Sequence, residues 1–291
     1  MIDYIFFENV NGATIALNED TYPVNSFESH VDTRRDELDR VLDHGRWPAY
    51  QFSGVRTFNI EGTILSDEKG IMQRALELQA AFVTSPWMAL QRIGRLHIKY
   101  TGIDEELISD VYLDGHPSIP LAGLSPQAAD FQIQLVSDSP AMFASQPIQY
   151  TTGSPQPGTG LVLENVVLEN VFLTGDAGTD VDVVNTGNME TYATMRLWGP
   201  VDAPLINMFH GSYQVQLNLG NAYLGAGEFI DIDMRERTII KNGAENAYQY
   251  YDPNGSEWFV FPPGSSTVSL SAYQAVAPAR LEIFLQAAYM I

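Results

Sequence analysis

The second half of the sequence constrains the fold most, because short alternating segments recur there about every 8–12 residues with turn residues between them. Side chains alternate between the two faces of a strand, and regularly spaced short strands are typical of an antiparallel sandwich. The sequence therefore predicts a C-terminal antiparallel β-sandwich over residues 180–291. Its expected strands are DVDVVNTG, TYATMRLWGP, PLINMF, YQVQLNLG, EFIDIDM, TIIKNG, WFVFPPG, STVSLSAY and RLEIFLQAAY.

Two turns in this half are predicted from residue types that favour particular turn conformations. Asn242-Gly243 suits a type I′ hairpin turn, which needs two consecutive positive φ angles. DPNGSE, residues 252–257, predicts a second tight turn. The segment around these turns carries no obvious reactive group, so we expect it to hold loops in place rather than to perform chemistry.

For residues 1–150, the sequence predicts an N-terminal domain of several strands with one helix packed across them. Its expected fold class is β-sandwich-like or α+β. A strand, a turn and a second strand are expected over Thr14–Val24, and a longer strand over Val55–Ile64. DFQIQLVSDSP alternates Phe131, Ile133 and Leu135 toward the interior.

The one expected helix lies near residues 66–84. Ser66 is the predicted N-cap and Pro86 ends the segment. An apolar stripe is expected to face the sheet, formed by Ile71, Ala75, Leu78 and Phe82.

The most charged segment is HVDTRRDELDRVLDHGRWPAYQF, beginning at His30. It is compatible with a short helix, but we favour an arm or long loop. Many charges in one irregular stretch suit pairing between subunits, although a solvated loop explains them nearly as well. The residues expected to make inter-subunit contacts are Arg34, Arg35, Asp36, Glu37, Asp39 and Arg40.

Residues 151–179 are predicted to be a linker or an insertion. They begin in a stretch rich in Gly, Pro, Ser and Thr, and continue with the near-repeat VLENV-VLENV. Five residues are too few for a solenoid repeat, which needs about 20 or more.

The chain is strongly acidic, with 15 Lys and Arg against 36 Asp and Glu and a formal charge of −21. Such a surface repels phosphate backbones and anionic membranes. Cysteine is absent, which excludes disulfides and thiolate metal sites. The N-terminus lacks the basic region of a signal peptide, and no apolar run approaches the ~18 residues of a membrane helix. We therefore expect a soluble protein made in a cytoplasm, without membrane insertion.

Catalytic and metal-binding patterns are absent from the sequence. The five histidines, at positions 30, 44, 97, 116 and 210, have no HxxxH or HExxH spacing. Two acidic pairs share a strand face, Asp180 with Asp182 and Asp231 with Asp233, and could hold a cation or act as acid and base. A solvated strand face is the preferred interpretation, with Asp176 adding only a weak calcium candidate. We expect no enzyme, no metal and no cofactor.

Aromatic residues gather near the second turn and are candidates for glycan or partner contact: Tyr248, Tyr250, Tyr251 and Trp258. Exposed aromatic faces beside a sandwich loop can stack on sugar rings. Because Trp258 and Phe259 are adjacent, one of them must point into the core. Core or subunit contact is the preferred role for most of this group.

The order of these elements resembles the distal tail proteins of long-tailed, non-contractile phages. The resemblance lies in VVNTGNMETYATMRLWGPVDAPLINM, LGAGEFIDIDMRERTIIKNG and SEWFVFPPGSSTVSL, and in the first half in VRTFNIEGTI, the helix, FVTSPWMAL and FQIQLVSDSPAMF. It covers roughly residues 14–150 and 180–291. The chain departs from the family pattern at Phe261, where leucine is usual, and at Ser266, where asparagine is usual.

The resemblance implies a structural protein of the virion rather than an enzyme. Family members form rings, usually hexamers, at the junction of the tail tube and the tail tip or baseplate. The N-terminal domain builds the ring, and the C-terminal sandwich is galectin-like or carbohydrate-module-like. The implied partners are other copies of the chain, the tail tube protein, the tail hub or tail-associated protein, the tape measure protein and receptor-binding proteins. DNA would pass through the lumen without specific binding. The alternative is a carbohydrate-binding module or adhesin that contacts host glycan.

Overall fold

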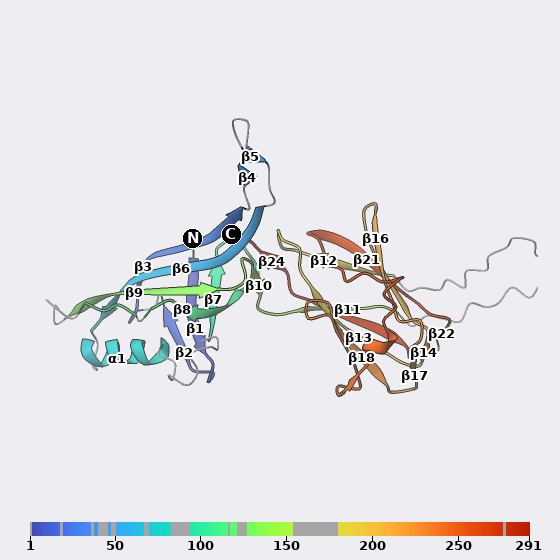
Figure 1. Ribbon diagram of the computed structural model, residues 1–291. Helices are drawn as coiled ribbons and strands as arrows, with labels where there is room; N and C mark the ends of the chain where they lie inside the picture. The colour runs from blue at the N-terminus through green and yellow to red at the C-terminus, as the bar shows by residue number, and fades with distance from the viewer. Residues whose placement is uncertain are drawn as a thin grey trace, which may run out of the picture. The chain divides into compact units, whose positions relative to one another are not determined.

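A computed structural model describes residues 2–17, 20–35, 38–39, 46–47, 51–66, 70–82, 94–115, 117–120, 127–153, 180–275 and 278–291. The chain divides into two compact units (Figure 1). Unit 1 comprises Met1–Ser145 together with Tyr289–Ile291, and unit 2 comprises Gln146–Ala288. The last three residues thus return to unit 1. Within the described ranges, no helix is long and apolar enough to cross a membrane.

Unit 1 is built on strands in the order β2-β1-β7-β8-β9-β6-β3, and neighbouring strands in this order run antiparallel. Strand β10 adds to β8 and also pairs with β24. Two short strands, β4 and β5, pair with each other. The bounds are β1 (Ile2–Asn9), β2 (Thr14–Leu17), β3 (Val24–Arg35), β4 (Leu38–Asp39), β5 (Arg46–Trp47), β6 (Gln51–Leu65), β7 (Gly94–Tyr100), β8 (Leu107–Leu113), β9 (Ala128–Ser137), β10 (Met142–Ala144) and β24 (Ala288–Tyr289).

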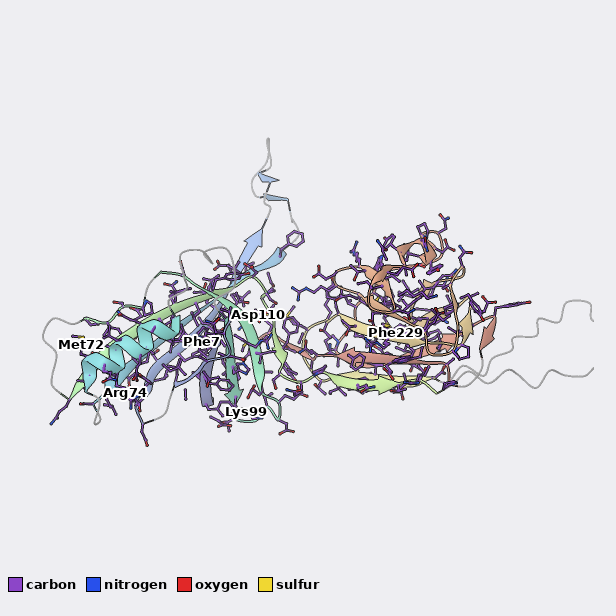
Figure 2. The ribbon with its side chains drawn as sticks, turned by 90° about the horizontal axis from the view of Figure 1, so that it is seen from below. Phe7, Met72, Arg74, Lys99, Asp110 and Phe229 are labelled. Atoms are coloured by element: carbon purple, nitrogen blue, oxygen red, sulfur yellow. The ribbon has the colours of Figure 1, made fainter. Side chains whose placement is uncertain are left out.

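Helix α1 (Ile71–Phe82) packs on this sheet through the predicted stripe. All four stripe residues are buried, and so are the predicted inward residues of β9, Phe131, Ile133 and Leu135. Phe82 stacks on Phe7 of β1, with ring centroids 4.3 Å apart (Figure 2). The opposite side of the helix exposes Met72 and Leu76. The alternating and helical patterns therefore identified the core of unit 1.

The predicted start of the helix is wrong, because Ser66 is not its N-cap. The helix begins at Ile71, directly after Gly70, whose φ of 74° lies in the left-handed region. The backbone N–H of Ser66 instead donates to the carbonyl of Gln127, at 3.0 Å. A residue with positive φ cannot continue a right-handed helix, so the turn at Gly70 sets the boundary.

Unit 2 is a β-sandwich of two antiparallel sheets, in the orders β11-β23-β13-β18-β19-β20 and β12-β21-β15-β16, with a small sheet β17-β14-β22. The bounds are β11 (Ile148–Thr151), β12 (Val181–Asn185), β13 (Ala193–Trp198), β14 (Val201–Asp202), β15 (Leu205–His210), β16 (Tyr213–Asn218), β17 (Tyr223–Leu224), β18 (Phe229–Asp233), β19 (Thr238–Lys241), β20 (Glu245–Asn246), the 3-10 helix η2 (Tyr248–Tyr250), β21 (Gly264–Ser271), β22 (Gln274–Ala275) and β23 (Arg280–Leu285). The mainly β class predicted from the sequence is confirmed.

The core of unit 2 lies between its two large sheets. Met195 and Leu197 of β13 are buried on the inner face of one sheet, and Met208 and Val268 are buried on the inner face of the other. Residues between them in sequence point outward, as the strand period of two requires. The side chains on the outer face of the six-stranded sheet therefore lie outside the core.

The Asn242-Gly243 turn is confirmed. Asn242 and Gly243 have φ of 51° and 73°, and the N–H of Ala244 donates to the carbonyl of Lys241, at 3.2 Å. Two consecutive positive φ angles are what a type I′ turn requires. The DPNGSE turn is also formed, since the N–H of Gly255 donates to the carbonyl of Asp252.

The predicted strand in WFVFPPG is wrong. This segment is extended but joins its neighbours only through the isolated bridge between Phe261 and Thr191. Two consecutive prolines follow and cannot donate to a strand ladder, which explains why pairing stops there. Phe259 and Phe261 are nonetheless buried, so the expectation that one of the adjacent Trp258 and Phe259 points inward is confirmed.

The Asn-x-Gly motif at the end of β12 joins three separate segments of unit 2. Asn185 is buried, and its Nδ2 donates to the carbonyls of Met189 (2.7 Å) and Phe261 (3.0 Å). Its Oδ1 accepts from the N–H of Gly187, at 3.0 Å. A Cβ on Gly187 would lie 1.9 Å from the carbonyl oxygen of Ala288. The glycine is therefore required by the close approach of another backbone.

Candidate functional site

A two-stranded ribbon of β3 and β6 extends past the sheet of unit 1 (Figure 1). Strand β9 pairs with β6 only from Arg56 to Leu65, whereas residues 51–53 of β6 pair with β3 alone. The pairing of β4 with β5 continues the ribbon. The described parts of the charged segment, residues 30–35, 38–39, 46–47 and 51–52, thus pair as strands and form an arm.

The arm contains the residues expected to make inter-subunit contacts. Arg34 and Arg35 lie on β3 and Asp39 lies on β4, where the structure describes only their backbone. Asp36, Glu37 and Arg40 lie outside the described residues. Their contacts with another subunit stay a prediction.

The base of the arm exposes apolar side chains that the sequence reasoning did not single out. Phe52 is 54% exposed and Val55 is 36% exposed. An isolated two-stranded ribbon is only marginally stable in water. Among the described residues, positions 33–35 of β3 and 51–53 of β6 pair with each other and with no further strand, which leaves their outer edges open. Exposed apolar residues beside unpaired strand edges are suited to contact with another chain.

Three of the four predicted aromatic contact residues form a cluster. The ring centroid of Tyr251 lies 5.3 Å from that of Tyr248 and 5.3 Å from that of Trp258, with interplanar angles of 33° and 19°. Burial raises the pKa of Tyr251. Tyr250 packs against the core of unit 2, and Tyr248 is exposed. The three rings pack against one another, and Tyr248 is the most exposed of them.

The acidic pairs make local contacts in the protein. Asp182 accepts a hydrogen bond from Thr267, at 2.9 Å. Asp233 caps the following turn by accepting from the N–H groups of Arg235 and Glu236. Asp180 is exposed. Among the described residues, no group of three His, Asp or Glu side chains could hold a metal ion.

His97 lies in a polar cluster on the face of β1 and β7 opposite α1. Its ring stacks on Phe6 at 4.1 Å, and its two nitrogens lie 2.6 Å from Glu106 Oε1 and 3.3 Å from Glu8 Oε2. Tyr4 donates to the other Glu106 oxygen, and this bond, with burial, raises the pKa of Tyr4 to about 12. Burial alone would raise the pKa of Glu106, but hydrogen bonds with His97 and Tyr4 lower it below its ordinary value of 4.5.

The lowered pKa of Glu106 predicts an acid-sensitive contribution to stability. A carboxylate whose pKa is lower in the folded state stabilises the fold above its unfolded pKa, and this contribution is lost as the pH falls through the folded pKa. Unfolding midpoints of the wild type and Glu106→Gln are therefore expected to differ at neutral pH and to converge as the pH falls below the ordinary glutamate pKa of 4.5. A difference that stays constant over this range would contradict the assignment.

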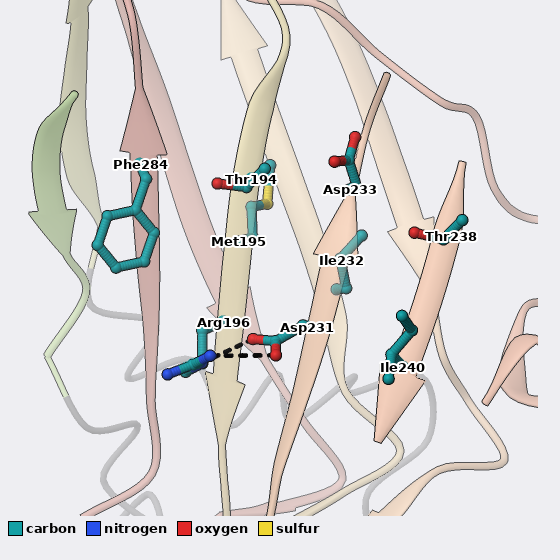
Figure 3. A pocket seen from close by; sticks show the side chains of 9 residues that line it. All are labelled: Thr194, Met195, Arg196, Asp231, Ile232, Asp233, Thr238, Ile240 and Phe284. Carbon is teal, nitrogen blue, oxygen red and sulfur yellow. Dashed lines mark hydrogen bonds and ion pairs between the residues drawn. The ribbon is translucent and has the colours of Figure 1, made fainter. Parts of the chain in front are cut away.

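The outer face of the six-stranded sheet in unit 2 carries a hollow of about 380 Å³ (Figure 3). Its lining residues are Thr194, Met195, Arg196, Asp231, Ile232, Asp233, Thr238, Ile240 and Phe284. Arg196 and Asp231 form a two-fold hydrogen-bonded ion pair, at 2.6 and 3.1 Å. The sequence indicates Asp231 and Asp233 as a pair on one strand face but does not reveal the hollow, because its other residues come from strands whose neighbours depend on the fold.

Comparisons with known proteins agree with this architecture. Residues 186–282 match the family model of the siphovirus-type tail component, C-terminal domain. The crystal structure of the phage SPP1 Dit protein is similar at a TM-score of 0.64, with 9% identity and 98% of each chain covered. Two structures of the phage p2 baseplate, with Ca and with Sr, have TM-scores of 0.49 and 0.48, identities of 10% and 9%, and coverage of 98% and 99% of both chains. No curated protein matches.

The fold is therefore that of a Dit protein, and unit 2 carries the C-terminal domain of a siphovirus-type tail component. The resemblance to the distal tail proteins of long-tailed phages is confirmed.

Proposed function

We propose that this chain is a structural protein of the phage tail tip, where copies of it form a ring that joins the tail tube to the baseplate and anchors the adsorption proteins. The observation that carries the proposal is the likeness to SPP1 Dit, described as a hub adsorption apparatus of phages that infect Gram-positive bacteria, over 98% of both chains. The tail-component match in unit 2 supports it independently.

The arm supplies a physical route to the ring. In this arrangement, the open edge of the arm pairs with a strand edge of a neighbouring copy. The same contact then repeats from copy to copy around one rotation axis. The copies close into a ring when the rotation between neighbours is a whole fraction of a full turn. Six copies are the number that the resemblance implies. In this arrangement Phe52 and Val55 lie in the contact between neighbours, which removes their apolar surface from water.

The proposed partners are the tail tube protein, the tail hub or tail-associated protein, the tape measure protein and the receptor-binding proteins. The charge of −21 supports passage of DNA through the lumen without binding, since like charges repel over about 8–10 Å at moderate salt. We place the mature protein in the virion, at the tail tip, and assign it no catalytic role.

The alternative of a glycan-binding module centred on Trp258 is less well supported. Tyr251 and Trp258 are half-buried against the core of unit 2, so Tyr248 is the one exposed ring of this cluster. A sugar platform needs at least one free aromatic face.

The oligomeric mass tests the proposal directly. Light scattering or native mass spectrometry is expected to find a species about six times the 32.3 kDa of the chain, seen as a ring by negative-stain imaging. Phe52→Asp, which places a charge in the proposed contact, is expected to shift the population toward the monomer. Phe209→Asp, at an exposed aromatic residue of unit 2, is the matched control and is expected to leave the ring intact.

Two results would count against this proposal. If the wild type stays a monomer at all concentrations and when mixed with its tail proteins, no ring forms. If Phe52→Asp and Phe209→Asp both keep the wild-type mass, the ring does not depend on the arm.

A further inference from the structure

The hollow on the outer face of the six-stranded sheet has the geometry of a preformed ligand site. The pairing register places Phe284, Thr194, Asp233 and Thr238 in one row across β23, β13, β18 and β19. The next row contains Glu282, Arg196, Asp231 and Ile240. Thr194 is the smallest residue in the middle of these rows, so the hollow lies over it, between Phe284 on one side and Ile240 on the other (Figure 3).

Arg196 is held in a fixed position by contacts on several sides. Its Nε and Nη2 donate to the two oxygens of Asp231, and this pairing raises the pKa of the guanidinium. Its guanidinium carbon lies 4.5 Å from the ring centroid of Phe229 and 5.6 Å from that of Trp198. A side chain held by a two-fold ion pair and by aromatic faces loses little entropy when it binds a ligand.

Several polar atoms around the hollow are available to a ligand. In the described chain, the hydroxyls of Thr194 and Thr238 have no hydrogen-bond partner in the protein, and only one oxygen of Asp233 is used, to cap a turn. The Nη1 group of Arg196 is not used in its bonds to Asp231. Donors and acceptors are thus both present around a site that also has an aromatic side and an aliphatic side.

We infer that this hollow binds a neutral saccharide unit. A sugar ring combines an apolar C–H face, which packs on an aromatic ring such as Phe284, with hydroxyl groups that both donate and accept hydrogen bonds. Asp233 and Arg196 supply charge-assisted partners for such hydroxyls. A polyanionic ligand is disfavoured, because the lining contains two aspartates against one arginine and the chain carries −21.

This inference goes beyond the proposed structural function, and it concerns a site other than the Trp258 cluster. The ring proposal is tested by the mass of the assembly, whereas saccharide binding is tested on the isolated chain. Either can fail without the other.

The test is a titration of the purified full chain with neutral hexose oligosaccharides, by saturation-transfer NMR and then calorimetry. Binding is expected with Kd on the order of millimolar, as suits a small, open site. Phe284→Ala is expected to weaken it about tenfold, because the substitution removes the aromatic ring on which the sugar packs. Thr194→Trp, which fills the hollow from the exposed face, is expected to abolish it.

Controls separate the hollow from other surfaces. Phe209→Ala, at an exposed aromatic residue on the other large sheet of unit 2, is expected to bind as the wild type does. Trp258→Ala is likewise expected to retain binding. Circular dichroism of Phe284→Ala and Thr194→Trp checks that both variants are folded.

The inference is overturned if no neutral oligosaccharide binds at tens of millimolar. It is equally overturned if binding depends on Trp258 and not on Phe284, or if only oligosaccharides that contain uronic acid bind. Should no saccharide bind while Phe284→Ala prevents incorporation into tails, the hollow is a protein interface and the inference is wrong.

Discussion

Arg56→Met is expected to lower the free energy of unfolding of unit 1 by about 3–5 kcal/mol. Arg56 is fully buried on β6, and its Nε donates to the carbonyl of Pro140, at 2.8 Å. Its Nη1 donates to Ser29 Oγ (2.5 Å) and to the backbone oxygen of Ile291 (2.9 Å). This one side chain thus connects β3, the segment before β10 and the last residue of the chain.

Two opposing effects decide the size of this change. Burial lowers the pKa of the Arg56 guanidinium, and its Nη2 is buried without a partner in the described chain, so removing the charge relieves part of a desolvation cost. Methionine, however, leaves the backbone oxygens of Pro140 and Ile291 and the Ser29 hydroxyl without their donor, at about 1–2 kcal/mol for each of these part-buried groups. The loss dominates because three acceptors remain and none is replaced.

Hydrogen exchange by mass spectrometry measures the effect in each unit separately. Amides of β6 and β9 are expected to lose protection in Arg56→Met, while those of unit 2 keep it. Arg95→Met is the matched control, because the Arg95–Asp110 ion pair is exposed and is worth at most about 1 kcal/mol. Equal exchange in the two variants would show that the buried contacts of Arg56 add nothing to stability.

Gly187→Ala is expected to destabilise unit 2 by about 3 kcal/mol or more. The added Cβ would lie 1.9 Å from the carbonyl oxygen of Ala288 and within 3 Å of two further backbone atoms of that residue. A backbone cannot rotate out of the way as a flexible side chain can, so the loop or the last strand must move. Such a movement also breaks the hydrogen bonds of the buried Asn185.

Chemical denaturation followed by circular dichroism measures this loss. Gly225→Ala is the control, because a Cβ there meets only the end of the Glu228 side chain at 3.5 Å. Its effect is expected to stay within about 0.5 kcal/mol. If Gly187→Ala unfolds at the same denaturant concentration as the control, the close approach of Ala288 is not a constraint on the fold.

Some features of the site could be predicted from the sequence and others could not. The sequence indicates the arm by its many charged residues, and it indicates the group near Tyr251 by its aromatic residues. The hollow was missed, since Phe284, Thr194 and Asp233 belong to three strands and meet only through their pairing. Buried Arg56 was also missed, because its position between Val55 and Thr57 in an alternating strand gives no sign that its charge is satisfied inside.

Elements that depend on local periodicity and local φ angles can be predicted from the sequence alone. These include the buried stripe of α1, the inward residues of β9, and the turn at Asn242-Gly243, each of which is set by residues within a few positions of one another. Strand spacing in the second half also determined the class of its fold.

Contacts between residues that are distant in the sequence are set by the folded arrangement of the strands. Arg56 reaches Ile291 across 235 positions, and the Arg196–Asp231 pair depends on the register of β13 with β18. A shift of one residue in that register would turn every outward side chain of a strand toward the core. The correct register is the one that buries the apolar side chains of both sheets at the same time. This condition involves strands from the whole domain, so no short stretch of sequence specifies it.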